Sequence, residues 1–152
     1  MSARGKRIEK VIVHRGKELD KRVAELSQQK QREAEAQNQA ERERQELLRA
    51  SETRLKLAAA PLSANAWIEA NEWLKTRAVK AEIAETHVVK ARLGTQRARA
   101  QVMNARTDLK KVEVLGTRIE NEERAKRERV ERRLEDEIAA LLFKPERGSG
   151  DK

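Results

Sequence analysis

The residues that most often carry out chemistry are scarce in this chain and stand far apart. Its two histidines, His14 and His87, have no second ligand three or four residues away in a recognisable metal-binding pattern. The sequence has no cysteine, which excludes a thiol nucleophile, a disulfide and a thiolate metal site. It also lacks a glycine-rich phosphate loop, a Gly-x-Ser-x-Gly elbow and a His-Glu-x-x-His motif. We therefore expect no metal and no other cofactor.

Carboxylates are plentiful, with 26 aspartate and glutamate residues. General acid and base catalysis needs a pocket that shifts the pKa of a carboxyl group. On a thin helical rod these side chains would stand in water, where nothing shifts their pKa. We therefore expect a protein that acts through protein contacts and is not an enzyme.

The composition predicts an all-α fold made of long helices. Of the 152 residues, 40% are charged and only 2% are aromatic, which is too little bulky apolar material for a globular core. Alanine, leucine, arginine, glutamate, lysine and glutamine dominate, and these residues enter helices at low cost. Disorder is the alternative if such helices find nothing to pack against.

Two prolines divide the chain into two helices and a tail. Pro61 and Pro145 are the only prolines, and proline disfavours helix both at its own position and before it. We expect one helical hairpin over residues 1–144. It would have a helix over about 6–60, a tip over about 61–74, a helix over about 75–143 and a flexible tail over 145–152. Ser63 or Asn65 can cap the second helix.

An apolar seam in alternating steps of four and three, typical of coiled coils, can be followed on both helices. On the first helix it passes through Ile12, Gly16, Leu19, Val23, Leu26, Lys30, Glu33, Gln37, Ala40, Arg44, Leu47 and Ser51. On the second it passes through Ala81, Ala84, Val88, Ala91, Thr95, Ala98, Val102, Ala105, Leu109, Val112, Gly116 and Ile119.

An antiparallel fold-back would pair these two seams. It sets Gly16 opposite Gly116 and Leu47 opposite Ala84, so that the paired numbers sum to 131 or 132. Facing glycines would allow the backbones to approach closely, whereas two unrelated glycines would only soften the helices. The constant sum favours a hairpin, monomeric when free, over a parallel dimer. Between Leu26 and Leu47 the first-helix seam holds only polar residues and alanine, so we expect weak packing there.

Three features could recruit partners. The tip concentrates both tryptophans, Trp67 and Trp73, which either anchor a partner or plug the end of the coiled coil. The segment from Leu134 to Phe143 is apolar and extends beyond the start of the first helix, so it either docks into a partner or folds back. The N-terminal stretch is basic, although a solvated helix face is the ordinary explanation of such a run.

The net charge of +9 raises the question of a nucleic-acid partner. Aromatic residues do not accompany the basic ones, and acidic residues are mixed along both helices. We therefore expect no nucleic-acid binding. No apolar run approaches the roughly 20 residues of a membrane span, so we expect no membrane insertion and a cytoplasmic location.

The sequence resembles the FliJ and YscO family, the small stalk proteins of flagellar and virulence type III secretion systems. The resemblance rests on the length, the two-helix layout with a tryptophan-containing turn, and two C-terminal segments. One is the charge-rich run Glu-Glu-Arg-Ala-Lys-Arg-Glu-Arg-Val-Glu-Arg-Arg over 122–133. The other is Asp-Glu-Ile-Ala-Ala-Leu-Leu-Phe over 136–143. The likeness covers nearly the whole chain.

The resemblance implies a stalk like the coiled coil of the rotary ATPase γ subunit. Both chain ends would enter the pore of the hexameric secretion ATPase, at the cytoplasmic face of the apparatus, and the tip would meet the membrane export gate. Secretion chaperones are a further implied partner class. The implied ATPase contacts are Arg4, Lys6, Arg7, Lys10, Ile138, Leu141 and Phe143. The implied gate contacts are Trp67, Ile68, Trp73 and Leu74.

Two other functions would fit a similar composition. A structural or scaffold coiled coil would form a long parallel dimer whose seam ignores Pro61. A stalk subunit of another rotary ATPase would look much alike, although this chain is short for that role.

Overall fold

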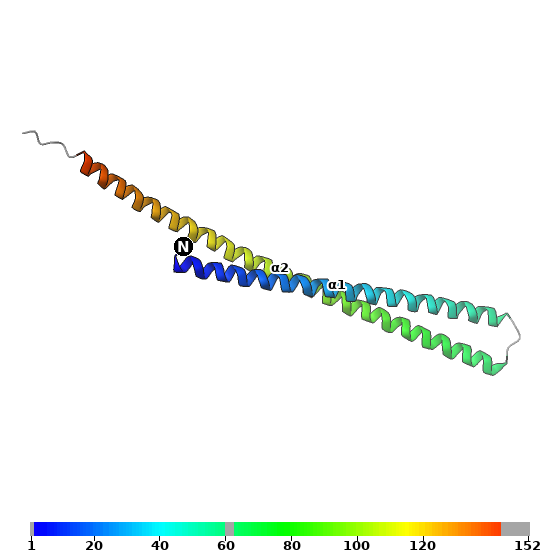
Figure 1. The fold of residues 1–152 in the computed structure, drawn as a ribbon. Coiled ribbons are helices and arrows are strands. Elements are labelled where there is room, and N and C mark those ends of the chain that lie inside the picture. The colour runs from blue at the N-terminus through cyan, green and yellow to red at the C-terminus, as the bar shows by residue number, and fades with distance from the viewer. Residues whose placement is uncertain (1, 60–62, 144–152) are drawn as a thin grey trace, which may run out of the picture. The chain divides into compact units, whose positions relative to one another are not determined.

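The computed structural model describes residues 2–59 and 63–143, which form two helices. Helix α1 spans Ala3–Ala58 and helix α2 spans Ala64–Leu142. They run antiparallel and form a coiled-coil hairpin, and no strand occurs in the described ranges (Figure 1). The all-α hairpin predicted from the sequence is therefore confirmed. Pro61, Pro145 and the predicted tail lie outside the described residues.

A serine caps the N-terminus of each helix. The Oγ atom of Ser2 accepts a hydrogen bond from the Gly5 N–H at 3.0 Å, and Ser63 Oγ accepts one from the Ala66 N–H at 3.2 Å. Each bond satisfies a backbone donor that has no partner within the helix. Of the two caps proposed for α2, the structure uses Ser63. Most of the segment 61–74 expected to form the tip is thus already helical.

The hairpin divides into two units. One consists of Met1–Lys17 and Thr107–Lys152, and the other of Glu18–Arg106. In each unit, a stretch of α1 packs against a stretch of α2.

On α2 the predicted seam is confirmed at every position. All twelve residues named for it are buried or half-buried, and Ala84, Val88, Thr95, Val102 and Ile119 are at most 4% exposed. The residues are small, so each contributes little apolar area, and the interface depends on their number and on close approach of the two backbones.

On α1 four of the twelve predicted seam positions were placed one residue too late. The interface steps three residues onward from Leu19, Leu26, Glu33 and Ala40, where four were predicted. The half-buried positions are therefore Arg22, Gln29, Ala36 and Glu43, in place of the exposed Val23, Lys30, Gln37 and Arg44. The other eight predicted positions, Ser51 among them, are buried or half-buried.

The observed phase brings small residues inward. Ala40 and Ala50 are 0% and 2% exposed, while Lys30 and Arg44 stay in water. Burial of Lys30 or Arg44 would have cost their hydration without a buried partner. As expected, the interface positions between Leu26 and Leu47 carry only polar residues and alanine.

The predicted register was also wrong, by about one heptad. Ala84 and Val88 form a cluster with Ala40 and Ala36, whereas Leu47 was predicted opposite Ala84. The connection between the helices is short, because α1 ends at Ala58 and α2 begins at Ala64. Pairing therefore starts closer to this connection than the predicted register, in which paired numbers sum to 131 or 132, would allow.

The predicted Gly16–Gly116 pair does not form either. A Cβ atom added to Gly16 would meet nothing within 4 Å. One added to Gly116 would lie 3.1 Å from Ile12 Cδ1 and 3.1 Å from Ile8 Cγ2. Gly116 therefore accommodates two isoleucine side chains of α1, and Gly16 is an ordinary helical glycine with open space beside it.

Gly94 likewise makes room for a side chain of the other helix. A Cβ atom at this position would lie 2.7 Å from Gln29 Oε1. The neighbouring Thr95 is 2% exposed, and its hydroxyl lies 3.1 Å from the Ala91 carbonyl oxygen and 3.4 Å from that of Gln29. Around Gly94 and Thr95 the seam thus replaces apolar bulk with close backbone approach and a hydrogen-bonded hydroxyl.

Ion pairs flank this seam. Arg44 donates hydrogen bonds to Glu85 at 2.8 and 2.5 Å, and these bonds raise the pKa of the Arg44 guanidinium. Arg92 approaches Glu33 at 3.7 Å. The pairs are largely exposed, so they help to select the register more than they stabilise the fold.

The two seam glycines give a direct test of the observed register. Gly16→Ala should raise the free energy of unfolding by about 1 kcal/mol, because alanine is the better helix former and its Cβ meets nothing. Gly116→Ala should gain clearly less, since its Cβ crowds Ile8 and Ile12 and the β-branched Ile8 has little freedom to move. Urea denaturation followed by circular dichroism measures both. Equal gains would contradict the packing of Gly116.

Candidate functional site

The C-terminal part of α2 has no helix beside it. In the described residues, its last hydrogen bond and ion pair with the start of α1 involve the Ser2 hydroxyl, which donates to a Glu123 carboxylate oxygen, and Arg4, which lies 3.8 Å from Glu122. Every residue over 126–143, here called the C-terminal overhang, is exposed (Figure 1). At about 1.5 Å per residue, it extends roughly 25 Å.

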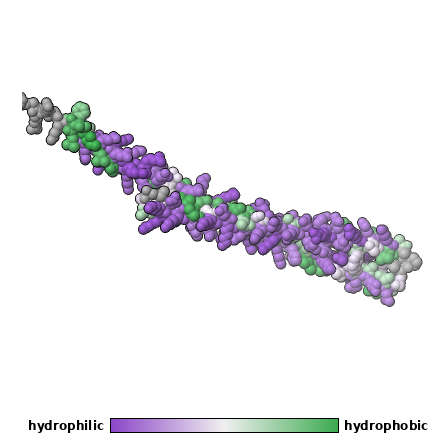
Figure 2. All heavy atoms as spheres, viewed as in Figure 1, coloured by the Kyte–Doolittle hydropathy of each residue, from purple (hydrophilic) through white to green (hydrophobic). Residues whose placement is uncertain are grey.

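One face of the overhang is apolar. Its residues are spaced three or four positions apart along one face and are 53–79% exposed, and we call them the C-terminal stripe: Val130, Leu134, Ile138, Leu141 and Leu142. Figure 2 shows this end of the described chain as a hydrophobic surface that follows strongly hydrophilic turns. Exposed apolar residues in a row are typical of a docking surface.

The three C-terminal residues implied by the resemblance do not share one face. Ile138 and Leu141 belong to the stripe. Phe143 is 84% exposed but lies about 140° around the helix from Ile138, at about 100° per residue. Val130, Leu134 and Leu142 were not among the implied contacts, although their spacing in the sequence identifies them.

The four implied N-terminal contacts are all exposed, in two settings. Lys6, Arg7 and Lys10 occupy the side of α1 away from Ile8, which faces α2. Their charges point into solvent and are available to a partner. Arg4 lies nearer the seam and is paired with Glu122, so its positive charge is partly compensated within the chain.

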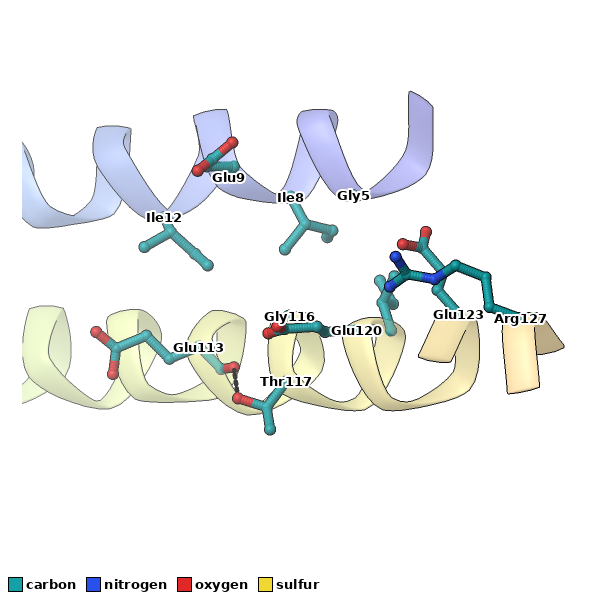
Figure 3. A pocket seen from close by; sticks show the side chains of 11 residues that line it. Gly5, Ile8, Glu9, Ile12, Glu113, Gly116, Thr117, Glu120, Glu123 and Arg127 are labelled. Carbon is teal, nitrogen blue, oxygen red and sulfur yellow. Dashed lines mark hydrogen bonds between the residues drawn. The ribbon is translucent and has the colours of Figure 1, made fainter. Parts of the chain in front are cut away.

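A shallow groove of about 470 Å³ lies between the start of α1 and the facing turns of α2. Figure 3 shows Ile8 and Ile12 pointing across it toward Gly116. Its rim carries the carboxylates Glu9, Glu113, Glu120 and Glu123 together with Arg127. The groove is open to solvent, so it offers room for side chains of a partner.

At the other end of the hairpin, two of the four implied gate contacts face α1. Trp67 and Leu74, seven residues apart, share one helix face and are half-buried. The guanidinium of Arg54 lies 5.3 Å from the centre of the Trp67 ring, which is within cation–π range. Trp67 therefore contributes to packing as well as to the surface.

Ile68 and Trp73 are the more exposed, outward members of the set. They are 57% and 43% exposed and lie about 140° apart around α2. Trp73 stands at the edge of the interface, where it lines a shallow groove with Ala50 and Thr53 of α1. Arg77 stands 5.4 Å from the centre of the Trp73 ring and 3.9 Å from Glu43, so one ring face is covered. The four tip residues thus form an inward pair and an outward pair.

A further exposed apolar row lies on α2 above the tip, and sequence reasoning missed it. Val79, Ile83, Val89 and Leu93 are 47–56% exposed and lie within about 120° of the helix circumference. They are opposite the seam residues that face α1. We call this row the outer stripe. Its spacing is less regular than that of the seam, which is why it was not recognised.

The described residues offer no metal site. No group of three or more histidine, aspartate or glutamate side chains in them is arranged to hold an ion. Within the same residues, no helix is long and apolar enough to cross a membrane.

The exposure of the overhang predicts that its apolar residues do not stabilise the free protein. Leu141→Ala with Phe143→Ala should change the free energy of unfolding by less than about 0.5 kcal/mol, because neither side chain is buried. Ile119→Ala, at a position 3% exposed, should cost about 2 kcal/mol or more. Chemical denaturation compares the two variants. A comparable loss in both would mean that the overhang folds back on the hairpin.

The sequence matches a known protein family over most of its length. The family model described as Flagellar FliJ protein matches residues 4–148. Comparisons with curated proteins and with solved structures gave no match. The matched range includes both helices, the tip and the overhang. This chain therefore belongs to the FliJ family of stalk proteins of flagellar and type III export systems.

Proposed function

We propose that this FliJ-family protein is a non-catalytic stalk that links the hexameric export ATPase to the membrane export gate. The family supports a role in the export apparatus. The individual contacts are our assignment. In this proposal the protein works at the cytoplasmic face of the apparatus, and its two chain ends and its tip serve different partners.

The observation that carries the proposal is the C-terminal overhang. An apolar helix face that no other part of the protein covers lowers solubility, so such a face is typically a binding site for another protein. The central pore of a ring ATPase is a suitable receptor, because it accepts a single helix end-on and can line it with apolar residues. Lys6, Arg7 and Lys10 add a positive charge beside the overhang for acidic groups at the pore entrance.

The tip is assigned to the export gate through its outward pair. Ile68 and Trp73 present apolar surface on two sides of α2, and tryptophan is a frequent interface anchor. Trp67 and Leu74 support this surface from within, because they hold the first turns of α2 against α1.

Secretion chaperones are assigned to the outer stripe. Val79, Ile83, Val89 and Leu93 offer an apolar helix face with no intramolecular cover, the kind of surface on which an amphipathic helix docks. This assignment leaves the two ends of the stalk free for the ATPase and the gate.

The ATPase contact predicts a face-specific loss of binding. Ile138→Asp with Leu141→Asp should abolish binding to the purified hexameric ATPase, because the charges replace the docking surface. The matched control is Ala139→Asp with Ala140→Asp, which adds the same charge on the other face of the same helix. Surface plasmon resonance with the ATPase immobilised measures both. Equal binding by the two variants would refute the stripe as the contact.

The gate contact predicts that the outward pair matters for binding and the inward pair for stability. Ile68→Ala with Trp73→Ala should abolish binding to the soluble domain of the gate protein while helicity stays nearly unchanged. Trp67→Ala should instead lower the free energy of unfolding by about 1–2 kcal/mol through lost packing. Pull-down and circular dichroism distinguish the two effects. If the Ile68/Trp73 variant unfolds, these side chains are structural plugs.

A further inference from the structure

The C-terminal stripe is the continuation of the surface that α2 presents to α1. Val130 lies about three full turns after Ile119, and Leu134 lies about five turns after Gly116. Ile119 is buried, and Gly116 meets Ile8 and Ile12 of α1. The stripe is therefore a stretch of coiled-coil seam from which the partner helix is missing, because α1 begins only at Ala3.

The charges of the overhang are divided between its two halves. Residues 126–133 hold five basic side chains, Lys126, Arg127, Arg129, Arg132 and Arg133, against two acidic ones, a net charge of +3. Residues 134–143 hold three acidic side chains, Glu135, Asp136 and Glu137, and no basic one, a net charge of −3. In the described part of the chain, none of the ion pairs within 4.0 Å involves residues 126–143.

We propose that the overhang of a second copy of this chain covers the stripe, with the two overhangs antiparallel about a two-fold axis near Leu134. In this arrangement the basic half of each copy faces the acidic half of the other. Val130 of one copy approaches Ile138 of the other. Parallel pairing would instead place like charges together, and flanking charges select orientation in coiled coils.

A second copy fits the stripe for two further reasons. The interface is self-complementary, as a two-fold dimer requires. The arriving helix also occupies the place in line with α1, so it need not displace any contact of the free chain. Because the paired segment is short, the association should be weak, with a dissociation constant of about 10–100 µM. The chain is then monomeric when dilute, as expected from the sequence, and dimeric when concentrated.

This pairing goes beyond the stalk function and competes with it. One stripe cannot contact the ATPase pore and a second copy at the same time. Self-association would thus keep the apolar end covered in unassembled protein and release it when the ATPase is available.

Charge reversal in each half tests the proposal on the full-length protein. One triple variant, Glu135→Lys, Asp136→Lys, Glu137→Lys, gives both halves of the overhang a net positive charge. The other, Arg129→Glu, Arg132→Glu, Arg133→Glu, gives both halves a net negative charge. Each variant alone should remain monomeric in analytical ultracentrifugation at about ten times the wild-type dissociation constant. An equimolar mixture of the two should form a heterodimer, because opposite charges then meet along the whole interface.

The control is Glu52→Lys, Glu69→Lys, Glu72→Lys, which makes the same change of charge on exposed residues near the tip and should dimerise like the wild type. A wild-type protein that stays monomeric up to about 1 mM would overturn the proposal and leave the ATPase or the chain's own residues 144–152 as the cover of the stripe. Two charge variants that remain monomeric when mixed would overturn the antiparallel orientation.

The stalk function is measured separately. Both charge variants retain all five apolar residues of the stripe, and each should be monomeric, so their binding to the immobilised ATPase can be measured without competition from self-association. Loss of dimerisation with ATPase binding retained separates the two interfaces. ATPase binding by the Ile138→Asp with Leu141→Asp variant tests the stalk proposal. The dimer proposal is tested separately, by the ultracentrifugation of the charge variants.

Discussion

Close approach of two helix backbones through small residues is the interaction on which this structure depends. The Ala36, Ala40, Ala84 and Val88 cluster has no large side chain, and Thr95 replaces apolar bulk with a satisfied hydroxyl. Dispersion contacts weaken steeply when surfaces separate, so an interface of small side chains is stable only when the backbones lie close together. The need for close backbone approach allows few alternative registers of α1 against α2. Positions outside the seam are free of this requirement, so charged residues can occupy them.

The small size of the interface also explains why exposed apolar residues gather on particular helix faces. A narrow seam buries few apolar residues, so the other apolar residues of either helix remain exposed. The C-terminal stripe, the outer stripe and the Ile68/Trp73 pair are of this kind. The C-terminal stripe lies where the partner helix is absent, the outer stripe lies on the opposite side of α2, and Trp73 lies at the edge of the interface. Surfaces with separate partners can therefore coexist on one simple hairpin.

Sequence periodicity predicted the hairpin and the whole α2 seam, because alanine, valine and isoleucine recur there without competition from polar residues. It failed at four positions of α1, and at two of them a step of three and a step of four both lead to a polar residue: Gln29 or Lys30 after Leu26, and Glu43 or Arg44 after Ala40. Register failed as well, because close fits such as Gly116 against Ile8 depend on atomic spacing and not on residue type. The predicted tip site is not uniform, because Trp67 is half-buried and Trp73 is exposed. This difference depends on where each residue lies around the helix, which a sequence motif does not specify.

The position of the tryptophans also gives the protein a built-in optical reporter. The chain contains no tyrosine, and its only two indole rings lie near the tip, each beside an arginine guanidinium at 5.3 or 5.4 Å. Emission excited in the red edge of the absorption band therefore originates from this one region. A ligand that separates a guanidinium from its ring alters the quantum yield, while events confined to the chain termini leave the emission spectrum unchanged.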